Sequence, residues 1–241
     1  APKMPGSLVE LVASDNGLQG TIPSNINQPN LETLILSPNR LSGQIPSDLL
    51  LRAPRLRVLD LSKNLLTGSI PEHPPGLRDP AFPINISRID LSSNQLFGSI
   101  PETIGGLWSV VRLDNNQLSS TLPTAMGWQC RDFSASFNQL SGNLPYSLMG
   151  LVRLQLDYNQ ITGTIPHVGS QTEYLSLSNN LIEGDLHMFK VMFGFGSLSH
   201  IDLSHNRISG TIPPLLASQT IASFVDLSYN QLEGTVPSFP R

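Results

Sequence analysis

One short frame of residues recurs along the whole chain, and this recurrence limits the possible folds more than any other feature. The copy over residues 34–46 reads LILSPNRLSGQIP, and the copy over residues 59–71 reads LDLSKNLLTGSIP. The frame contains leucines, one asparagine, a glycine and an isoleucine–proline pair. Its asparagine occurs ten times, with neighbours 21 to 30 residues apart, at Asn16, Asn39, Asn64, Asn94, Asn116, Asn138, Asn159, Asn180, Asn206 and Asn230. We therefore expect residues 1–241 to form a single repeat domain of about ten units.

Each position of the frame has a physical role. Alternating residues such as Leu59 and Leu61 predict a short strand with one buried face, and strands of successive repeats can stack into one parallel sheet. The asparagine ends the strand, and its amide can satisfy backbone groups left unpaired by the turn. Gly43 and its equivalents permit a turn with unusual backbone angles. The proline that follows favours extended or 3₁₀-like structure over a long helix. Because one repeat cannot bury its own apolar face, neighbouring repeats must supply the core of a solenoid.

The frame L-x-x-L-x-L-x-x-N-x-L-x-G-x-I-P resembles the plant-type leucine-rich repeat. That repeat occurs in receptor-like kinases, receptor-like proteins and polygalacturonase-inhibiting proteins. The resemblance implies an α/β-type repeat solenoid, a right-handed superhelix with one parallel β-sheet on the concave face and 3₁₀ or irregular segments on the convex side. It also implies an extracellular or cell-surface location and a role in binding protein or peptide ligands.

The chain departs from the family in its cysteines. Family ectodomains usually open with a capping segment that carries paired cysteines, whereas Cys130 is the only cysteine here. An uncapped repeat would expose its leucines to water at a cost in free energy. We therefore expect the chain to be part of a longer protein, or other subunits to cover its ends.

Composition and motifs argue against several other classes of function. Eighteen acidic and 14 basic residues give a net charge of −4, which disfavours nucleic acid as a partner. No apolar run approaches the ~18 residues of a membrane span. The sequence has no Gly-rich phosphate loop, serine-hydrolase elbow or HExxH motif. Cys130 falls in a core column, where a buried thiol is inert. We expect no enzymatic activity, no cofactor and no metal.

Aromatic and basic side chains gather at exposed columns of the frame. The relevant columns lie six, four and one residue before the asparagine, and neighbours within a column should be ~4.8 Å apart across the sheet. Exposed aromatics beside arginines are typical of binding hot spots. The predicted ligand-binding residues are Arg112, Phe137, Arg153, Tyr158, Tyr174, His200, His205 and Tyr229.

The leading hypothesis is a non-enzymatic recognition scaffold that binds a protein or peptide through its concave face, as part of a cell-surface receptor-like protein. One modification site is expected at Asn85, within the sequon Asn85-Ile86-Ser87. Two alternatives are a structural subunit that docks other chains through its ends and a secreted inhibitor of a wall-degrading enzyme. A fourth, ice binding, would need regular Thr or Asn arrays, whereas the exposed columns before each asparagine mix serine with charges.

Overall fold

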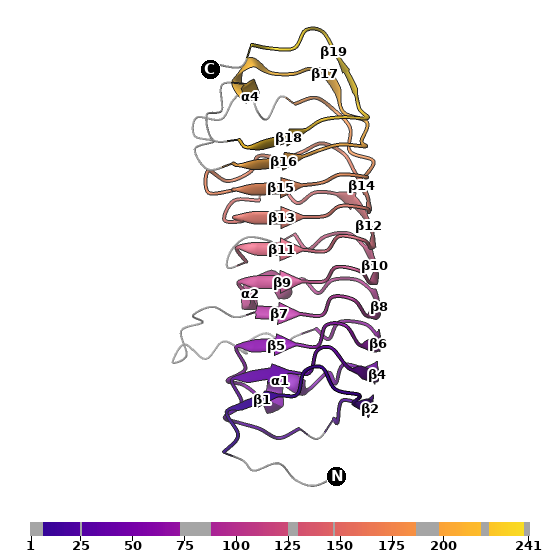
Figure 1. Ribbon diagram of the computed structural model, residues 1–241, viewed down its shortest axis with the longest axis vertical. Coiled ribbons are helices and arrows are strands. Elements are labelled where there is room, and N and C mark those ends of the chain that lie inside the picture. Colours follow the sequence, from indigo (N-terminus) through magenta and orange to yellow (C-terminus); the bar gives the residue numbers. More distant parts are fainter. Residues whose placement is uncertain are drawn as a thin grey trace.

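The computed structural model is an elongated stack of short parallel strands, arranged like the rungs of a ladder from the N-terminal to the C-terminal end (Figure 1). It describes residues 7–24, 26–72, 88–124, 130–146, 148–186, 198–217 and 222–238. This arrangement confirms the predicted leucine-rich repeat solenoid.

The main sheet has ten parallel strands of three residues each, one from every repeat. In order, its strands are β1 (Glu10–Val12), β3 (Thr33–Ile35), β5 (Val58–Asp60), β7 (Arg88–Asp90), β9 (Val110–Arg112), β11 (Asp132–Ser134), β13 (Arg153–Gln155), β15 (Tyr174–Ser176), β16 (His200–Asp202) and β18 (Phe224–Asp226). The register aligns equivalent frame positions, so that Tyr174 lies opposite Arg153 on one side and His200 on the other. The columns of the sequence are therefore rows on the face of this sheet.

A second parallel sheet follows the asparagines, where we expected irregular segments. Its seven strands are β2 (Gln19–Thr21), β4 (Arg40–Gln44), β6 (Leu65–Gly68), β8 (Gln95–Gly98), β10 (Gln117–Ser120), β12 (Gln139–Asn143) and β14 (Gln160–Thr162). Strands β17 (Ser209–Thr211) and β19 (Gln231–Glu233) pair separately in the last repeats. This sheet forms because backbone groups just after each asparagine can pair with those of the next repeat.

The remaining connections contain three helices of four residues each within the described part of the chain. They are α1 (Leu49–Arg52), α2 (Ile104–Leu107) and α4 (Pro214–Ala217). None of the helices in this part is long and apolar enough to cross a membrane. The short helices agree with the proline that most copies of the frame contain, because proline disfavours long helical segments.

The core runs between the two sheets and is almost entirely aliphatic. The middle residue of each strand from β3 to β16 in the ten-stranded sheet is buried, as at Leu59, Val111 and Leu154. Burial weakens in the last repeat, where Val225 is 38% exposed and the equivalent Ile201 only 1%. Cover of the ends by further chain or another subunit stays a prediction.

The asparagines form a hydrogen-bonded ladder, as predicted. Asn159 shows the pattern: its Nδ2 donates to the carbonyl oxygen of Ala135 at 3.0 Å and to that of Leu156 at 3.1 Å. Its Oδ1 accepts a hydrogen bond from the backbone N–H of Leu140 at 2.9 Å. Each such amide therefore joins its own turn to the preceding repeat and satisfies backbone groups that the turn leaves unpaired.

Candidate functional site

Aromatic and cationic side chains stack across the C-terminal half of the ten-stranded sheet. They occupy the first position of strands β13, β15, β16 and β18, and we call them the strand row: Arg153, Tyr174, His200 and Phe224. The guanidinium carbon of Arg153 lies 4.3 Å from the centroid of the Tyr174 ring. The Tyr174 and His200 rings stack with centroids 4.0 Å apart, and the His200 and Phe224 rings with centroids 4.4 Å apart. Side chains from four repeats thus form one continuous stack.

A second row lies at the other end of the strands, on the residue just before each asparagine. We call this the turn row, and its members in the sixth to tenth repeats are Phe137, Tyr158, Asn179, His205 and Tyr229. The Phe137 and Tyr158 rings stack at 4.5 Å, and the His205 and Tyr229 rings at 4.0 Å, measured between centroids. Phe137 and Tyr158 are about half exposed, and Tyr229 is 74% exposed.

The turn row has an unusual backbone conformation. Its residues have φ between 53° and 57°, in the left-handed region. That region suits Asn, Asp and Gly, whereas bulky side chains are uncommon there. A non-glycine residue with these angles carries a cost of roughly 1–2 kcal/mol. Aromatic residues at these positions are therefore not explained by the turn itself.

Between the two rows lies a shallow groove with an acidic floor. It encloses about 890 Å³ including open solvent, and its lining includes Tyr174 and His200 on one side and Phe137, Tyr158 and His205 on the other. The floor contains Asp157, Asp202 and the buried residues Ser176, Ser178 and Ser204. The groove runs along the solenoid, across the strands, so that an extended ligand could contact several repeats.

Serine donors position both carboxylates of the floor. Oδ1 of Asp157 accepts hydrogen bonds from Ser176 Oγ at 2.6 Å, from the Ser178 backbone N–H at 2.9 Å and from Ser178 Oγ at 2.9 Å. Oδ1 of Asp202 accepts hydrogen bonds from the N–H and Oγ of Ser204 at 3.0 and 2.7 Å. These hydrogen bonds fix the orientation of both carboxylates on the floor of the groove.

Burial shifts the titration of two residues of the strand row. Desolvation lowers the pKa of His200, with a smaller contribution from the charge of Arg153, while Asp202 and Asp157 oppose the shift. Desolvation also raises the pKa of Tyr174, with a further contribution from the charge of Asp157. At neutral pH this row therefore presents a neutral imidazole and a neutral phenol to the groove.

Arg112, one of the predicted ligand-binding residues, is engaged in a different interaction. Its Nη1 and Nη2 donate to the two carboxylate oxygens of Asp132 on the adjacent strand, at 2.7 and 2.6 Å. This hydrogen bond to Asp132 raises the pKa of Arg112. Five of the predicted residues line one groove: Phe137, Tyr158, Tyr174, His200 and His205. Arg153 and Tyr229 belong to the two rows beside it. Arg112 lies outside the lining. The role of these residues in ligand binding stays a prediction.

Asp157 and Asp202 are absent from the sequence-based set of binding residues. Asp157 lies two residues before its asparagine, in a column that is otherwise mostly serine. Asp202 lies four residues before its asparagine, in a column that also contains Asp60, Asp90 and Asp226. The position of Asp157 and Asp202 on the floor depends on the parallel register of β13, β15 and β16. A sequence search for charged residues within these two columns would have found them.

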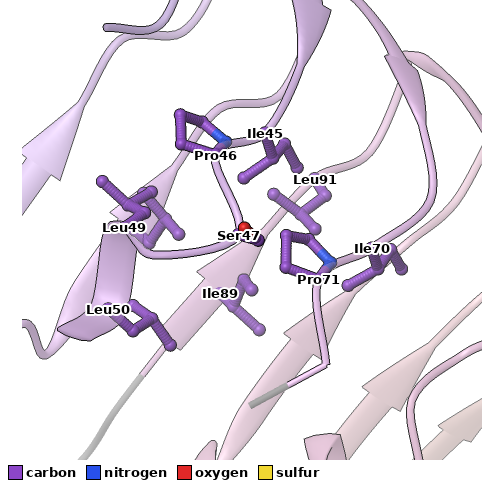
Figure 2. Close-up of a pocket in the computed structure, with 10 residues that line it drawn as sticks. Ile45, Pro46, Ser47, Leu49, Leu50, Ile70, Pro71, Ile89 and Leu91 are labelled. Atoms are coloured by element: carbon purple, nitrogen blue, oxygen red, sulfur yellow. The ribbon is translucent and has the colours of Figure 1, made fainter. Parts of the chain in front are cut away.

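A separate apolar pocket lies between the turns of earlier repeats. Figure 2 shows Leu49 and Leu50 of α1, Ile89 of β7, and Pro46 and Pro71 of two successive turns around it. Residues 73–87, which follow the lining residue Pro71 closely in the sequence, are outside the described part of the chain. Asn85, the predicted glycosylation site, falls in that same segment.

Cys130 is a buried core residue, as predicted. It is free and inaccessible to solvent. Burial raises the pKa of its thiol to about 12. A thiol of this kind is inert at neutral pH, because the thiolate is the reactive form.

Comparisons with known proteins agree with this architecture. The Leucine Rich Repeat family model matches residues 30–50, 55–77, 85–107 and 197–219. The plant peptide hormone receptor RGFR1, solved in complex with RGF2, is 31% identical with a TM-score of 0.82 and covers 95% of this chain. The ectodomain of the Arabidopsis thaliana receptor kinase GASSHO1/SCHENGEN3, solved with CASPARIAN STRIP INTEGRITY FACTOR 2, has the same identity and TM-score over 96% of this chain. A plant ice-binding protein is 25% identical with a TM-score of 0.71, over 97% of this chain and 76% of its own. No curated protein matches the sequence.

The frame, the two sheets and these similarities define the class of protein. The chain is a leucine-rich repeat protein, and its repeats are of the plant type. Among the solved structures, it is similar to the ligand-binding ectodomains of plant receptor kinases. It spans 37% of the RGFR1 chain and 28% of the GASSHO1/SCHENGEN3 chain.

Proposed function

We propose that this chain is a non-enzymatic, extracellular recognition scaffold that binds a peptide or an extended protein segment in the groove between the strand row and the turn row, on the concave face of the solenoid. The receptor ectodomains to which it is similar were solved with RGF2 and CASPARIAN STRIP INTEGRITY FACTOR 2 bound. These complexes support our proposal that the partner of this chain is a peptide or protein and that its native setting is a cell-surface receptor-like protein.

The single observation that carries this proposal is the aromatic side chains of the turn row. Phe137 and Tyr158 remain about half exposed, and Tyr229 more so, while all three hold a left-handed backbone. Neither core packing nor the turn requires an aromatic ring there, and the backbone cost opposes one. Exposed, stacked rings on a rigid sheet are well suited to ligand contact, because binding then needs little ordering of the protein.

A peptide-panning experiment tests the proposal. The purified chain is immobilised and exposed to a random peptide library, in parallel with the variant Tyr158→Asn/His205→Asn, whose new residues suit the left-handed backbone. Enrichment of particular sequences on the native chain, with affinities at least about tenfold weaker on the variant, is the expected result. Equal enrichment on both proteins would place binding elsewhere.

A second candidate function, ice binding, is favoured by the outer face of the seven-stranded sheet. Polar residues of successive strands lie opposite one another on this sheet, where the register pairs Ser119 with Gln139, Ser141 with Gln160, and Asn143 with Thr162. Their spacing across parallel strands is ~4.8 Å. The columns of the ten-stranded sheet lack such arrays. The polar face of the seven-stranded sheet is a candidate because a plant ice-binding protein is similar to this chain.

The two candidate functions depend on different sheets and can be separated. Ice binding predicts thermal hysteresis that is lost in Thr162→Arg, on the seven-stranded sheet, and kept in Gln155→Arg, on the ten-stranded sheet. The absence of thermal hysteresis in the native chain would exclude this second function.

A further inference from the structure

The groove is acidic, although the sequence indicates a surface of aromatics beside arginines. Of the two arginines in the predicted set, Arg112 is paired with Asp132, and Arg153 lies over the Tyr174 ring. Among the described residues that line the groove there are two aspartates, and neither a lysine nor an arginine. The charge that a ligand meets inside the groove is therefore negative.

The geometry points to a peptide that inserts the side chain of a lysine or arginine between the two rows, with its charge toward Asp157 and Asp202. This inference rests on the proposed function and names the chemical class of its ligand.

Three features of the groove fit a basic side chain together. The rings of Tyr158, Tyr174 and Phe137 line the groove and can cover the aliphatic part of a lysine or arginine. The two carboxylates below provide the opposite charge, and a charge-assisted hydrogen bond to them is about twice as strong as a neutral one. The serine donors already hold both carboxylates in place, so binding need not reorganise them.

The carboxylates are not equivalent, and this decides the choice of variant. Asp157 joins neighbouring repeats, since it accepts hydrogen bonds from Ser176 and Ser178 of the next repeat. The hydrogen bonds described for Asp202 come from Ser204, two residues further along its own turn. Asp202→Asn therefore removes the charge with the smaller effect on the stack.

Asp60 provides a matched control. It occupies the same frame position as Asp202, and its Oδ1 accepts hydrogen bonds from the N–H and Oγ of Ser62 at 3.0 and 2.8 Å. It lies on β5, outside the lining of the groove. Asp60→Asn thus repeats the chemical change at a site that a peptide in the groove does not contact.

The pH dependence of peptide binding gives a second, independent test of the inference, through His200. His200 faces Tyr174 and Phe224 across the stack, and Asp202, Asp157 and Arg153 are the charged groups whose fields act on it. Protonation of His200 on acidification places a positive charge at the wall of the groove. A basic peptide then binds more weakly, whereas an acidic peptide binds more tightly.

The experiment uses a random library of N-acetylated, C-amidated peptides, so that only side chains carry charge, and pans it on the native chain, Asp202→Asn and Asp60→Asn. Circular dichroism melting curves check that each protein is folded. We expect Lys and Arg to be enriched at one position on the native chain and on Asp60→Asn, and the enrichment to be lost on Asp202→Asn. For a selected peptide, replacing the basic residue with norleucine should weaken binding about tenfold.

The other outcomes overturn the inference in distinguishable ways. Enriched peptides without Lys or Arg, or with Asp or Glu, would reject the basic side chain and leave the proposed function standing. Equal basic enrichment on native chain and Asp202→Asn would place the cation elsewhere. Failure of any peptide to be enriched would reject both the inference and the proposed function.

Discussion

The rings of Phe137 and Tyr158 stack with centroids 4.5 Å apart and planes within 12° of parallel, although both residues hold a left-handed backbone. The stacking of an aromatic pair is worth about 0.5–1.5 kcal/mol, which is close to the cost of one bulky residue at such angles. Because both residues carry that backbone cost, the stack offsets only part of it in the folding free energy. What remains is an exposed pair of rings available for contact with a ligand.

Tyr158→Asn should accordingly change stability little. The variant loses the stack with Phe137 and gains a residue that accepts φ near 54°. We expect the free energy of unfolding, measured with urea, to stay within about 1 kcal/mol of the native value. A loss of several kcal/mol would show that the ring is a structural element and would weaken its assignment as a binding residue.

Ser120→Gly should stabilise the protein. Ser120 occupies the glycine position of the fifth repeat and has φ of 76°, which an L-residue adopts at a cost. Removing the side chain should raise the free energy of unfolding by about 0.5–1 kcal/mol, after allowing for the greater flexibility of glycine in the unfolded chain. The converse variant, Gly142→Ala, should destabilise, because its new Cβ would lie 2.8 Å from Thr121 Cγ2.

Asn159→Ala should be among the more damaging single changes. It removes both donors to Ala135 and Leu156 and leaves the buried Leu140 N–H without its acceptor. A loss of about 3 kcal/mol in unfolding free energy is expected from unsatisfied buried groups. Gln160→Ala, one residue further and exposed, serves as the control and should cost less than about 0.5 kcal/mol. Similar losses for the two variants would contradict the role assigned to the ladder.

Stability should decline as the solution becomes acidic, in part through His200. Its pKa is lowered in the folded state, so the unfolded state binds the proton more tightly. The contribution of His200 is therefore fully present above its ordinary pKa of about 6.5 and is lost as pH falls through the folded value. NMR titration should place the pKa of His200 below 6.5, and His200→Phe, which can keep the stack, should show a shallower decline. A titration midpoint above 6.5 would contradict the burial argument.

The thiol of Cys130 should be unreactive in the folded protein. With a pKa of about 12 and no solvent access, it holds almost no thiolate at about pH 8. An Ellman assay should detect no thiol in the native chain and one per chain in concentrated guanidinium chloride. Rapid labelling without denaturant would mean that this part of the core opens readily.

The repeat frame by itself determined the architecture of this protein. The period and the apolar positions specify that each repeat contributes one buried strand, and Asn159 and its equivalents have one chemical role available at the end of that strand. These properties depend only on a repeat and its nearest neighbour. Aligning the repeats of the chain with one another is therefore enough to predict them.

Only the tertiary structure decided how the surface residues combine. Arg112 and Asp132 come from adjacent strands and form a bidentate pair, and Arg112 lies outside the lining of the groove. Asp157 and Asp202 become the floor of a groove because the parallel register places them between two rows of rings. The physical reason is that the period sets which residues share a row, whereas the sign of the local charge depends on which side chains across rows neutralise one another.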